Sequence, residues 1–381
     1  MTYGAITFKG RRGIFSKFAE LNWFIIFLIT AIAGVGFVML YSVAGGDLEP
    51  WAMRQMIRFA VGMVLMIAVA ITNLRFWAQA AYPIYIGALA LLIGVEFLGT
   101  MGMGAQRWID LGFFRLQPSE IMKLALVMAL ARYYHGITLR EALTLRSLII
   151  PLILIALPAG LVLRQPDLGT AVLLLAGGLA IMFLGGVRLW IFVAGGLSLL
   201  AAIPVAWGFL KDYQKDRILT FLNPENDPLG AGYHIMQSKI ALGSGGVYGK
   251  GFLLGTQSQL NFLPEKQTDF IFTMLAEEFG LLGGLGLLSL YALLIGYAIL
   301  VSLTIRSHFG RLLTMGLAFT FFLYVFINTA MVMGLVPVVG VPLPLVSYGG
   351  SAMFTLMIGF GLILSAALHR DAIIARSGAL I

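Results

Sequence analysis

An aspartate at the head of a hydrophobic segment is the residue of this sequence best placed to do chemistry. Asp269 ends the polar stretch 264–269 and directly precedes an apolar segment of membrane-spanning length. A carboxylate that faces lipid costs on the order of a few kcal/mol, so Asp269 is expected to line a cavity or a pathway. Within hydrogen-bond reach of a hydroxyl group it can accept a proton, which is general-base chemistry. Helix capping by Thr268 or Asp269 is the structural alternative, and the positive end of that helix is expected to keep Asp269 ionised.

A second pair of charges lies inside an apolar segment. Glu120 and Lys123 are three residues apart on a helix that Pro118 opens, so they share one face and can form an ion pair. Pairing lowers the cost of placing charges within a membrane. The pair is therefore either structural, holding helices together, or part of a substrate site.

Further polar residues are expected on the same side of the membrane. Arg107 shortly precedes the helix of Glu120, and Asp167 follows Arg164 where one span ends and the next begins. Asp167 is placed as an N-terminal cap, and capping alone explains its presence. An anion-binding rim is the alternative, because a guanidinium offers phosphate a fixed fork of donors.

The glycine-rich segment 243–255 matches no phosphate-binding fingerprint. A Walker loop requires glycine at position 244 and serine or threonine at position 251, where Ser244 and Gly251 stand. Flexible backbone at a membrane surface is the main interpretation, and backbone N–H groups that cradle a pyrophosphate are the alternative. The adjacent acids Glu277 and Glu278 cannot face the same way, so one is expected in a cavity and the other at the interface. The sequence contains no cysteine, and its four histidines show no metal-ligand spacing.

The elements that must position these residues are membrane-spanning helices. The chain of 381 residues is 60% hydrophobic and 11% charged, with a mean hydropathy of +0.95, which excludes a soluble globular protein. About ten apolar spans are predicted, each of roughly 20 residues. They cover 21–46, 59–74, 76–95, 118–131, 147–163, 168–187, 189–210, 270–305 and two spans between 311 and 369 that divide at the Pro/Gly-rich break 334–350. The fold class is thus all-α, a polytopic integral membrane protein.

The charge distribution sets the expected orientation. With the N-terminus inside, most of the arginines and lysines that flank the spans lie on the cytoplasmic side, as the positive-inside rule requires. Both termini are then cytoplasmic, and residues 1–20 form a basic lead that either lies on anionic lipid or flanks the first span. Two outside connections are long, 99–118 and 210–269, and the second is interpreted as one large extracytoplasmic loop. The net charge of +8 therefore reflects topology and not nucleic-acid binding.

Taken together, five segments resemble the SEDS family (shape, elongation, division and sporulation), the polytopic peptidoglycan glycosyltransferases of bacteria. They read GAQRWIDLG (104–112), QPSEIMKLA (117–125), RQPDLGTA (164–171), FLPEKQTDFIFTMLAEEFG (262–280) and PLPLVSYGGSA (342–352). The last two blocks are closer to the rod-shape (RodA-like) branch than to the division (FtsW-like) branch. The resemblance implies a single domain over 1–381, with ten transmembrane helices, that polymerises lipid II on the outer face of the bacterial cytoplasmic (inner) membrane.

The resemblance also implies roles for individual residues. Asp269 matches the catalytic aspartate of the family. The residues expected to bind substrate, by motif position or as cations for a leaving diphosphate, are Arg107, Glu120, Lys123, Asp167, Arg217 and Ser347. A divalent cation, Mg²⁺ or Mn²⁺, is a further candidate for the diphosphate, with unknown ligands.

The implied reaction is attack by a sugar hydroxyl of one lipid-linked disaccharide on the anomeric carbon of the growing strand, with undecaprenyl pyrophosphate leaving. Family members work with a class B penicillin-binding protein, the transpeptidase, and the rod branch also joins elongation-complex shape proteins. Two other functions fit the spans. A flippase for lipid-linked precursors would use the intramembrane charges and the broken segment 334–350. A non-catalytic scaffold for cell-wall enzymes leaves those charges unexplained.

Overall fold

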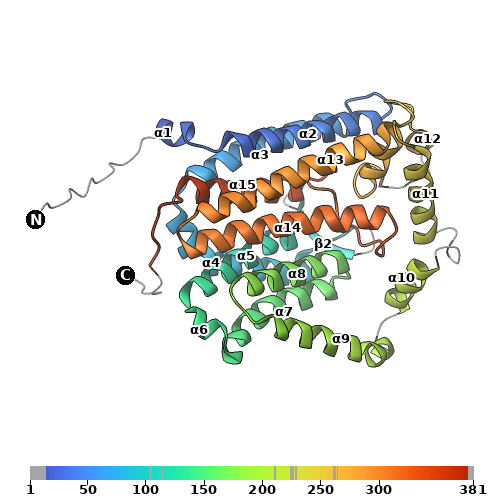
Figure 1. The fold of residues 1–381 in the computed structure, drawn as a ribbon. Coiled ribbons are helices and arrows are strands. Elements are labelled where there is room, and N and C mark those ends of the chain that lie inside the picture. The colour runs from blue at the N-terminus through green and yellow to red at the C-terminus, as the bar shows by residue number, and fades with distance from the viewer. Residues whose placement is uncertain are drawn as a thin grey trace, which may run out of the picture.

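The protein is a bundle of membrane-spanning helices with a very small β-sheet and a helical segment at one end (Figure 1). The computed structural model describes residues 14–102, 105–110, 112, 115–209, 212–223, 227, 230–260, 263 and 265–375. The helices are α1 (Ile14–Ala19), α2 (Trp23–Val43), α3 (Ala52–Ile71), α4 (Leu74–Leu98), α5 (Pro118–Gly136), α6 (Leu139–Ala142), α7 (Ile149–Arg164), α8 (Leu168–Leu184), α9 (Leu189–Phe209), α10 (Asp212–Leu222), α11 (Ala231–Ser244), α12 (Thr256–Gln259), α13 (Ile271–Thr304), α14 (His308–Val332) and α15 (Gly350–Leu368).

The helices confirm the predicted multi-pass membrane architecture. Within the described ranges, seven of them are long and apolar enough to cross a bilayer, and α8 and α9 are apolar but shorter. Helix α5 has 19 residues but carries Glu120 and Lys123, which lower its hydropathy. The seven long helices together with α5, α8 and α9 correspond to the ten spans expected from the sequence. The predicted break 334–350 falls between α14 and α15.

Several helix starts are fixed by polar side chains that accept bonds from first-turn amides. Asn22 accepts from the amide of Ile25 at the start of α2, and Ser307 accepts from the amide of Gly310 at the start of α14. Such caps satisfy backbone donors that have no partner within the helix. Helix α3 begins at Ala52, seven residues before the predicted start at 59, because the prediction kept charged residues out of a span that tolerates them near its end.

Close packing between helices depends on small residues. A Cβ atom at Gly361 of α15 would lie 2.7 Å from the carbonyl oxygen of Met66 in α3. A Cβ atom at Gly36 of α2 would lie equally close to Val346, in the segment before α15. Without a hydrophobic driving force between helices in lipid, such backbone approach supplies much of the packing energy.

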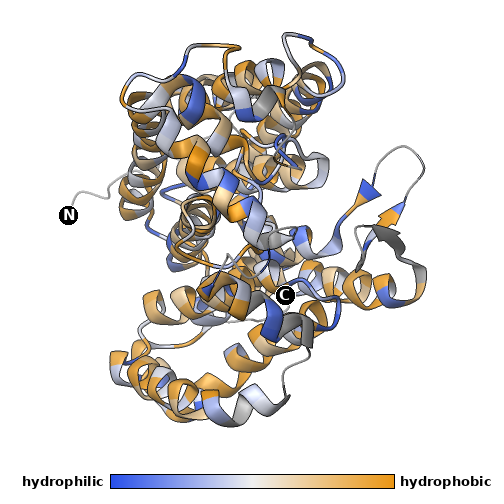
Figure 2. Cartoon of the chain, turned by 90° about the vertical axis from the view of Figure 1, so that its right-hand side faces the viewer, coloured by the Kyte–Doolittle hydropathy of each residue, from blue (hydrophilic) through white to orange (hydrophobic). Residues whose placement is uncertain are grey.

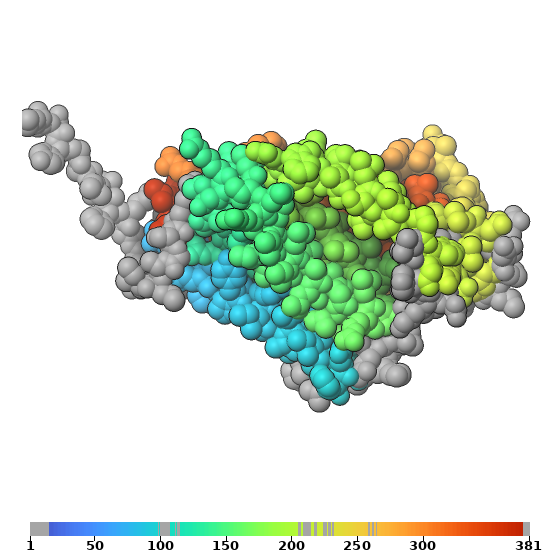
Figure 3. All heavy atoms as spheres, turned by 90° about the horizontal axis from the view of Figure 1, so that it is seen from below, coloured from blue at the N-terminus to red at the C-terminus, as the bar shows by residue number. Residues whose placement is uncertain are grey.

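Helix α9 stands apart from the rest of the bundle. Its apolar side chains are exposed along most of its length, with Leu199 at 73%. Figure 3 shows a hollow in this face of the molecule between α9 and the helices α7 and α8. The protein therefore presents an indentation of its membrane-embedded surface beside the helix that Asp167 caps.

A small antiparallel sheet replaces part of the loop predicted over 99–118. Its strands are β1 (Thr100–Gly102), β2 (Ala105–Asp110) and β3 (Arg115–Leu116), in the order β1-β2-β3. Figure 2 looks onto this end of the molecule, where the strands project beside helices coloured mainly hydrophobic. The prediction of an all-α chain missed this sheet because its strands are too short for a period to show.

The glycine-rich segment is built into an interruption of α13. Gly280 has φ 64° and breaks the helix, so the carbonyl groups of Glu277 and Glu278 lose their helical donors. The amides of Lys250 and Gly251 donate to these two carbonyls, at 3.0 Å each. In return, the amides of Leu281 and Leu282 donate to carbonyls of the glycine-rich segment. The interruption of α13 thus anchors the glycine-rich segment to the bundle.

The same segment also binds both glutamate side chains. Lys250 Nζ lies 2.7 Å from Glu277 Oε1, and the amides of Thr256 and Gln257 donate to the same carboxylate. Glu278 accepts from the amide of Leu253 at 3.4 Å and from Ser42 Oγ of α2 at 2.5 Å, and it is buried like its neighbour. The expectation of one acid in a cavity and one at the interface is therefore wrong. The described loop amides serve these acids, so the structure gives no support to a pyrophosphate cradle here.

We predict that Gly280→Ala destabilises the protein by about 2 kcal/mol or more. A Cβ atom at this position would lie within 2.6 Å of the amide nitrogen of Gly249 and the carbonyl of Val247, and the positive φ disfavours any L side chain. Thermal unfolding in detergent measures the effect. Gly286→Ala in the same helix is the control, because its Cβ atom would meet nothing within 4 Å. Equal unfolding midpoints for the two variants would contradict this account.

Candidate active site

The Asp269 carboxylate lies at the head of α13 and does not cap it. The helix begins at Ile271 with Phe270 as its N-cap residue, and no side chain accepts a bond at that cap. Thr268 Oγ1 instead donates to the Glu265 side chain at 2.9 Å. The capping alternative for Asp269 is thus wrong. Among the described residues, no hydrogen bond or ion pair engages the Asp269 carboxylate, and Gly340 is its close neighbour.

The surroundings of Asp269 favour its protonated form. Burial, and after it the nearby charges of Glu265 and Asp167, raise the pKa of Asp269 to about 6. Removing a carboxylate from water disfavours its charged form, and like charges add to the effect. The raised pKa still lies below 7, so the expectation of an ionised Asp269 holds at neutral pH. Asp269 is therefore a stronger base than a solvent-exposed aspartate, while remaining mostly ionised at neutral pH.

Backbone bonds hold Asp269 in place and leave its side chain free. Asn328 Nδ2 of α14 donates to the Asp269 carbonyl at 2.8 Å and to the Val341 carbonyl at 2.7 Å. The Tyr348 amide donates to the Gln267 carbonyl at 2.8 Å. The loop that carries Asp269 is thus tied to α14 and to the segment between α14 and α15, on both sides of the carboxylate.

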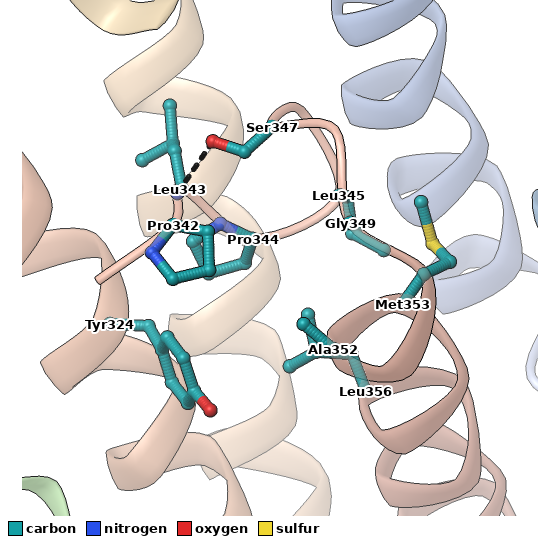
Figure 4. Close-up of a pocket in the computed structure, with 10 residues that line it drawn as sticks. All are labelled: Tyr324, Pro342, Leu343, Pro344, Leu345, Ser347, Gly349, Ala352, Met353 and Leu356. Atoms are coloured by element: carbon teal, nitrogen blue, oxygen red, sulfur yellow. Dashed lines mark hydrogen bonds between the residues drawn. The ribbon is translucent and has the colours of Figure 1, made fainter. Parts of the chain in front are cut away.

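Ser347 is one of these ties. Its hydroxyl donates to the Thr268 carbonyl at 2.5 Å and accepts from the Leu343 amide at 2.8 Å. The residue was expected to bind substrate, and the structure shows its oxygen occupied in fixing two loops together. Ser347 also lines a pocket with Tyr324, the Pro342–Leu345 turn and the first turn of α15 (Figure 4).

Glu120 and Lys123 form the predicted ion pair, and a tyrosine completes it. Lys123 Nζ lies 2.7 Å from Glu120 Oε1 and also donates to the hydroxyl of Tyr324. The Tyr324 hydroxyl donates in turn to Glu120 Oε2 at 2.8 Å. The Lys123 side chain is 3% exposed, so this triangle is closed from solvent. Pairing and hydrogen bonding together are what make buried charges tolerable.

Tyr324 is a site residue that sequence analysis missed. Nothing in its apolar segment marks it, and its partners lie about two hundred positions earlier in the chain. Asn328 is one turn further along the same face of α14. Helix α14 therefore connects the buried triangle at Tyr324 to the Asp269 loop held by Asn328.

Arg107 and Asp167 meet at the start of α8. Arg107 Nε donates to the Gln165 carbonyl at 3.1 Å, its Nη2 donates to the Pro166 carbonyl, and its Nη1 lies 4.0 Å from Asp167 Oδ2. Asp167 caps α8, accepting from the amide and the hydroxyl of Thr170. The capping interpretation of Asp167 holds, and its charge also reaches Asp269.

Two expectations for the site, Arg217 and a divalent cation, are not tested by the described residues. Arg217 lies in α10, and its side chain is outside the described residues. Within the described part of the chain, no three histidine or acidic side chains are grouped so as to hold a metal ion.

Comparison with known proteins decides the family. The model of the FtsW/RodA/SpoVE family, described as cell cycle proteins, matches residues 21–372. The chain belongs to this family. Escherichia coli (strain K12) MrdB, named a peptidoglycan glycosyltransferase, is 47% identical over 345 residues, which cover 90% of this chain and 92% of MrdB. Treponema pallidum RodA, named likewise, is 30% identical over 91% of this chain and 97% of its own.

Solved structures of the FtsW/RodA/SpoVE family share the fold. The rod-shape-determining protein RodA of Thermus thermophilus superposes with a TM-score of 0.70 at 30% identity, covering 93% of this chain and 98% of its own. A chain from a peptidoglycan synthase complex, described as coordinating polymerization and crosslinking, superposes with a TM-score of 0.81 at 33% identity. It covers 92% of this chain and 98% of its own length.

We predict that Tyr324→Phe lowers the unfolding midpoint by about 3 °C or more, because it removes one donor from Glu120 and one acceptor from Lys123 in a buried site. Thermal unfolding in detergent measures this. Tyr133→Phe, which loses a single bond to the Ser147 carbonyl in a half-buried position, is the control and should change the midpoint less. An unfolding midpoint for Tyr324→Phe at or above that of Tyr133→Phe would contradict a stabilising role of the Tyr324 hydroxyl between Glu120 and Lys123.

Proposed function

We propose that this chain is a peptidoglycan glycosyltransferase that polymerises lipid II into glycan strands during cell elongation, with Asp269 as general base. The named activities of the MrdB and RodA relatives support the reaction. The role of Asp269 is carried by its carboxylate, which has no partner among the described residues. Burial raises the pKa of this carboxylate to about 6, and hydrogen bonds hold the backbone beside it in place. A base with a pKa near the working pH is suited to proton transfer.

The proposed reaction is a single displacement. The 4-hydroxyl of one lipid-linked disaccharide attacks the anomeric carbon of the growing strand, and a new C–O bond forms. The bond from that carbon to the diphosphate breaks, and its electron pair leaves with undecaprenyl pyrophosphate. The hydroxyl proton passes to Asp269. Among the described residues near the loop 265–269, only the Asp269 carboxylate has no hydrogen-bond partner. A single available carboxylate can act as base but leaves no second one to act as nucleophile, which favours inversion without a covalent intermediate.

The leaving diphosphate needs positive charge, and two described cations are proposed for it. Arg107 is 28% exposed at the rim, and its guanidinium lies beside Asp167. Lys123 lies deeper and is bound to Glu120 and Tyr324. It is proposed to contact the diphosphate only when the substrate displaces Glu120 or Tyr324, and otherwise to fix the positions of these two residues. Arg217 stays a third prediction. A divalent cation also stays a prediction; it would take its oxygen ligands mainly from the diphosphate, and no step above depends on it.

The orientation of the protein in the membrane and its partners are further parts of this proposal. The positive-inside rule puts both termini in the cytoplasm and Asp269 on the outer face of the bacterial cytoplasmic membrane. A class B penicillin-binding protein is the proposed transpeptidase partner, supported by the similarity to a chain of the peptidoglycan synthase complex. Elongation-complex shape proteins and membrane lipids are further proposed partners, and the growing glycan strand is the donor substrate.

We predict that Asp269→Asn abolishes polymerisation of labelled lipid II by the purified protein, assayed alone and with a class B penicillin-binding protein. The amide keeps the size of the side chain but cannot accept the hydroxyl proton. Asp47→Asn, an exposed acid in the loop between α2 and α3, is the control and should keep its activity.

Unchanged unfolding midpoints would show that both variants are folded. Glycan polymer made by Asp269→Asn at the wild-type rate would remove Asp269 from the mechanism. The flippase alternative has its own signature, which is translocation of lipid II across liposomes by a wild-type protein that makes no polymer.

A further inference from the structure

Arg58 of α3 carries a charge that no carboxylate balances among the described residues. Its guanidinium stacks over the Tyr348 ring, with Cζ 4.5 Å from the ring centroid. Its Nη1 atom is buried and has no hydrogen-bond partner. A buried donor without a partner costs about 1–3 kcal/mol, and more when it is charged, so a group that satisfies it is to be expected.

The guanidinium lies against the N-terminus of α15. A Cβ atom at Gly350 would lie 3.6 Å from Arg58 Nε, so the side chain packs on the first residue of that helix. The cap residue Gly349 offers no side-chain acceptor, and the first-turn amides that follow it have no intrahelical partner. The N-terminus of a helix carries partial positive charge. These two positive groups are in contact, and neither has an anionic partner among the described residues, so a shared anion would stabilise both.

Ser351 adds a second unpartnered group at this point. It is 4% exposed, and its hydroxyl has no hydrogen-bond partner. The Cα–Cβ bond of a helical residue tilts toward the helix N-terminus, and Ser351 lies in the first turn of α15, next to the residue on which Arg58 packs. A guanidinium, a hydroxyl and free first-turn amides together make the donor set of a phosphate site.

The position in the membrane says what carries the anion. Ile57 and Val61, on either side of Arg58 in sequence, are 57% and 54% exposed and face lipid. Trp51 at the start of α3 marks the interface, as tryptophan does in membrane proteins. The Arg58 side chain tilts toward this end of the helix, so its charge reaches the depth of lipid headgroups.

We propose that Arg58, Ser351 and the first-turn amides of α15 bind the phosphate group of a membrane lipid. The carrier is either the headgroup of an anionic phospholipid or the diphosphate of a polyprenyl lipid. The second source rests on the proposed function, and the first does not. In both cases the site lies next to the pocket of Figure 4, because Gly349 lines that pocket and precedes α15.

Native mass spectrometry of the full-length protein in detergent tests this site by lipid titration. The probes are phosphatidylglycerol, undecaprenyl pyrophosphate, and a diacylglycerol with the same acyl chains as the phosphatidylglycerol but no phosphate. Arg58→Gln should weaken binding of a phosphate-bearing probe about tenfold or more, and Ser351→Ala about fivefold. Arg115→Gln, which removes an exposed cation on the same side of the membrane, should leave binding unchanged.

The outcomes separate the two sources and do not depend on catalysis, so they stand even if Asp269 is not the base. A loss confined to phosphatidylglycerol assigns the site to phospholipid, and a loss confined to undecaprenyl pyrophosphate assigns it to the polyprenyl lipid. Arg58→Gln that binds both like the wild type would overturn the site, as would diacylglycerol binding as tightly as phosphatidylglycerol. Should Arg58→Gln fail to fold, wild-type affinities for both lipids in Ser351→Ala would overturn it instead.

Discussion

A carboxylate that leaves water at a membrane surface needs a cation or several hydrogen-bond donors, and the acids of this protein divide according to that constraint. Glu120 is paired with Lys123 and Tyr324. Glu277 takes Lys250 and loop amides, and Glu278 takes Ser42. Asp269 is the exception among these four, because within the described residues its carboxylate has no such partner. The chemistry proposed for the protein depends on that difference.

The fold maintains this difference by fixing the backbone around Asp269 and not its side chain. Asn328, Ser347 and Tyr348 all bond to carbonyl groups of residues 267–269, so the loop cannot relax to find a partner for the carboxylate. Two further acids, Asp167 and Glu265, are near enough to raise its pKa. The satisfied acids have a complementary role. Those of α13 bind the glycine-rich segment and keep it attached to this helix.

Local patterns in the sequence predicted what depends on nearest neighbours along a helix. Hydropathy placed α13 within one residue at each end, and the three-residue spacing of Glu120 and Lys123 predicted their ion pair. The cap at Asp167 followed from its place before α8. Contacts between distant segments were not predictable. Tyr324 lies in an apolar helix like any other. Glu277 takes its partners from a loop whose glycines suggested flexibility, and Glu278 is bound by Ser42 of α2 and by one amide of the same loop. The raised pKa of Asp269 depends on burial by several such segments, so it could not be predicted from the position of Asp269 before a helix.

The pH dependence of polymerisation under saturating lipid II tests the central claim most directly, because it measures the ionisation of the base in the working protein. Burial raises the pKa of Asp269, so the carboxylate is roughly nine-tenths ionised at pH 7 and loses its charge as the pH falls through about 6. The account predicts a plateau in rate above pH 7 and half of that rate near pH 6, with the protein still folded. A rate that stays constant down to pH 5, as an exposed aspartate with its ordinary pKa would allow, would contradict it.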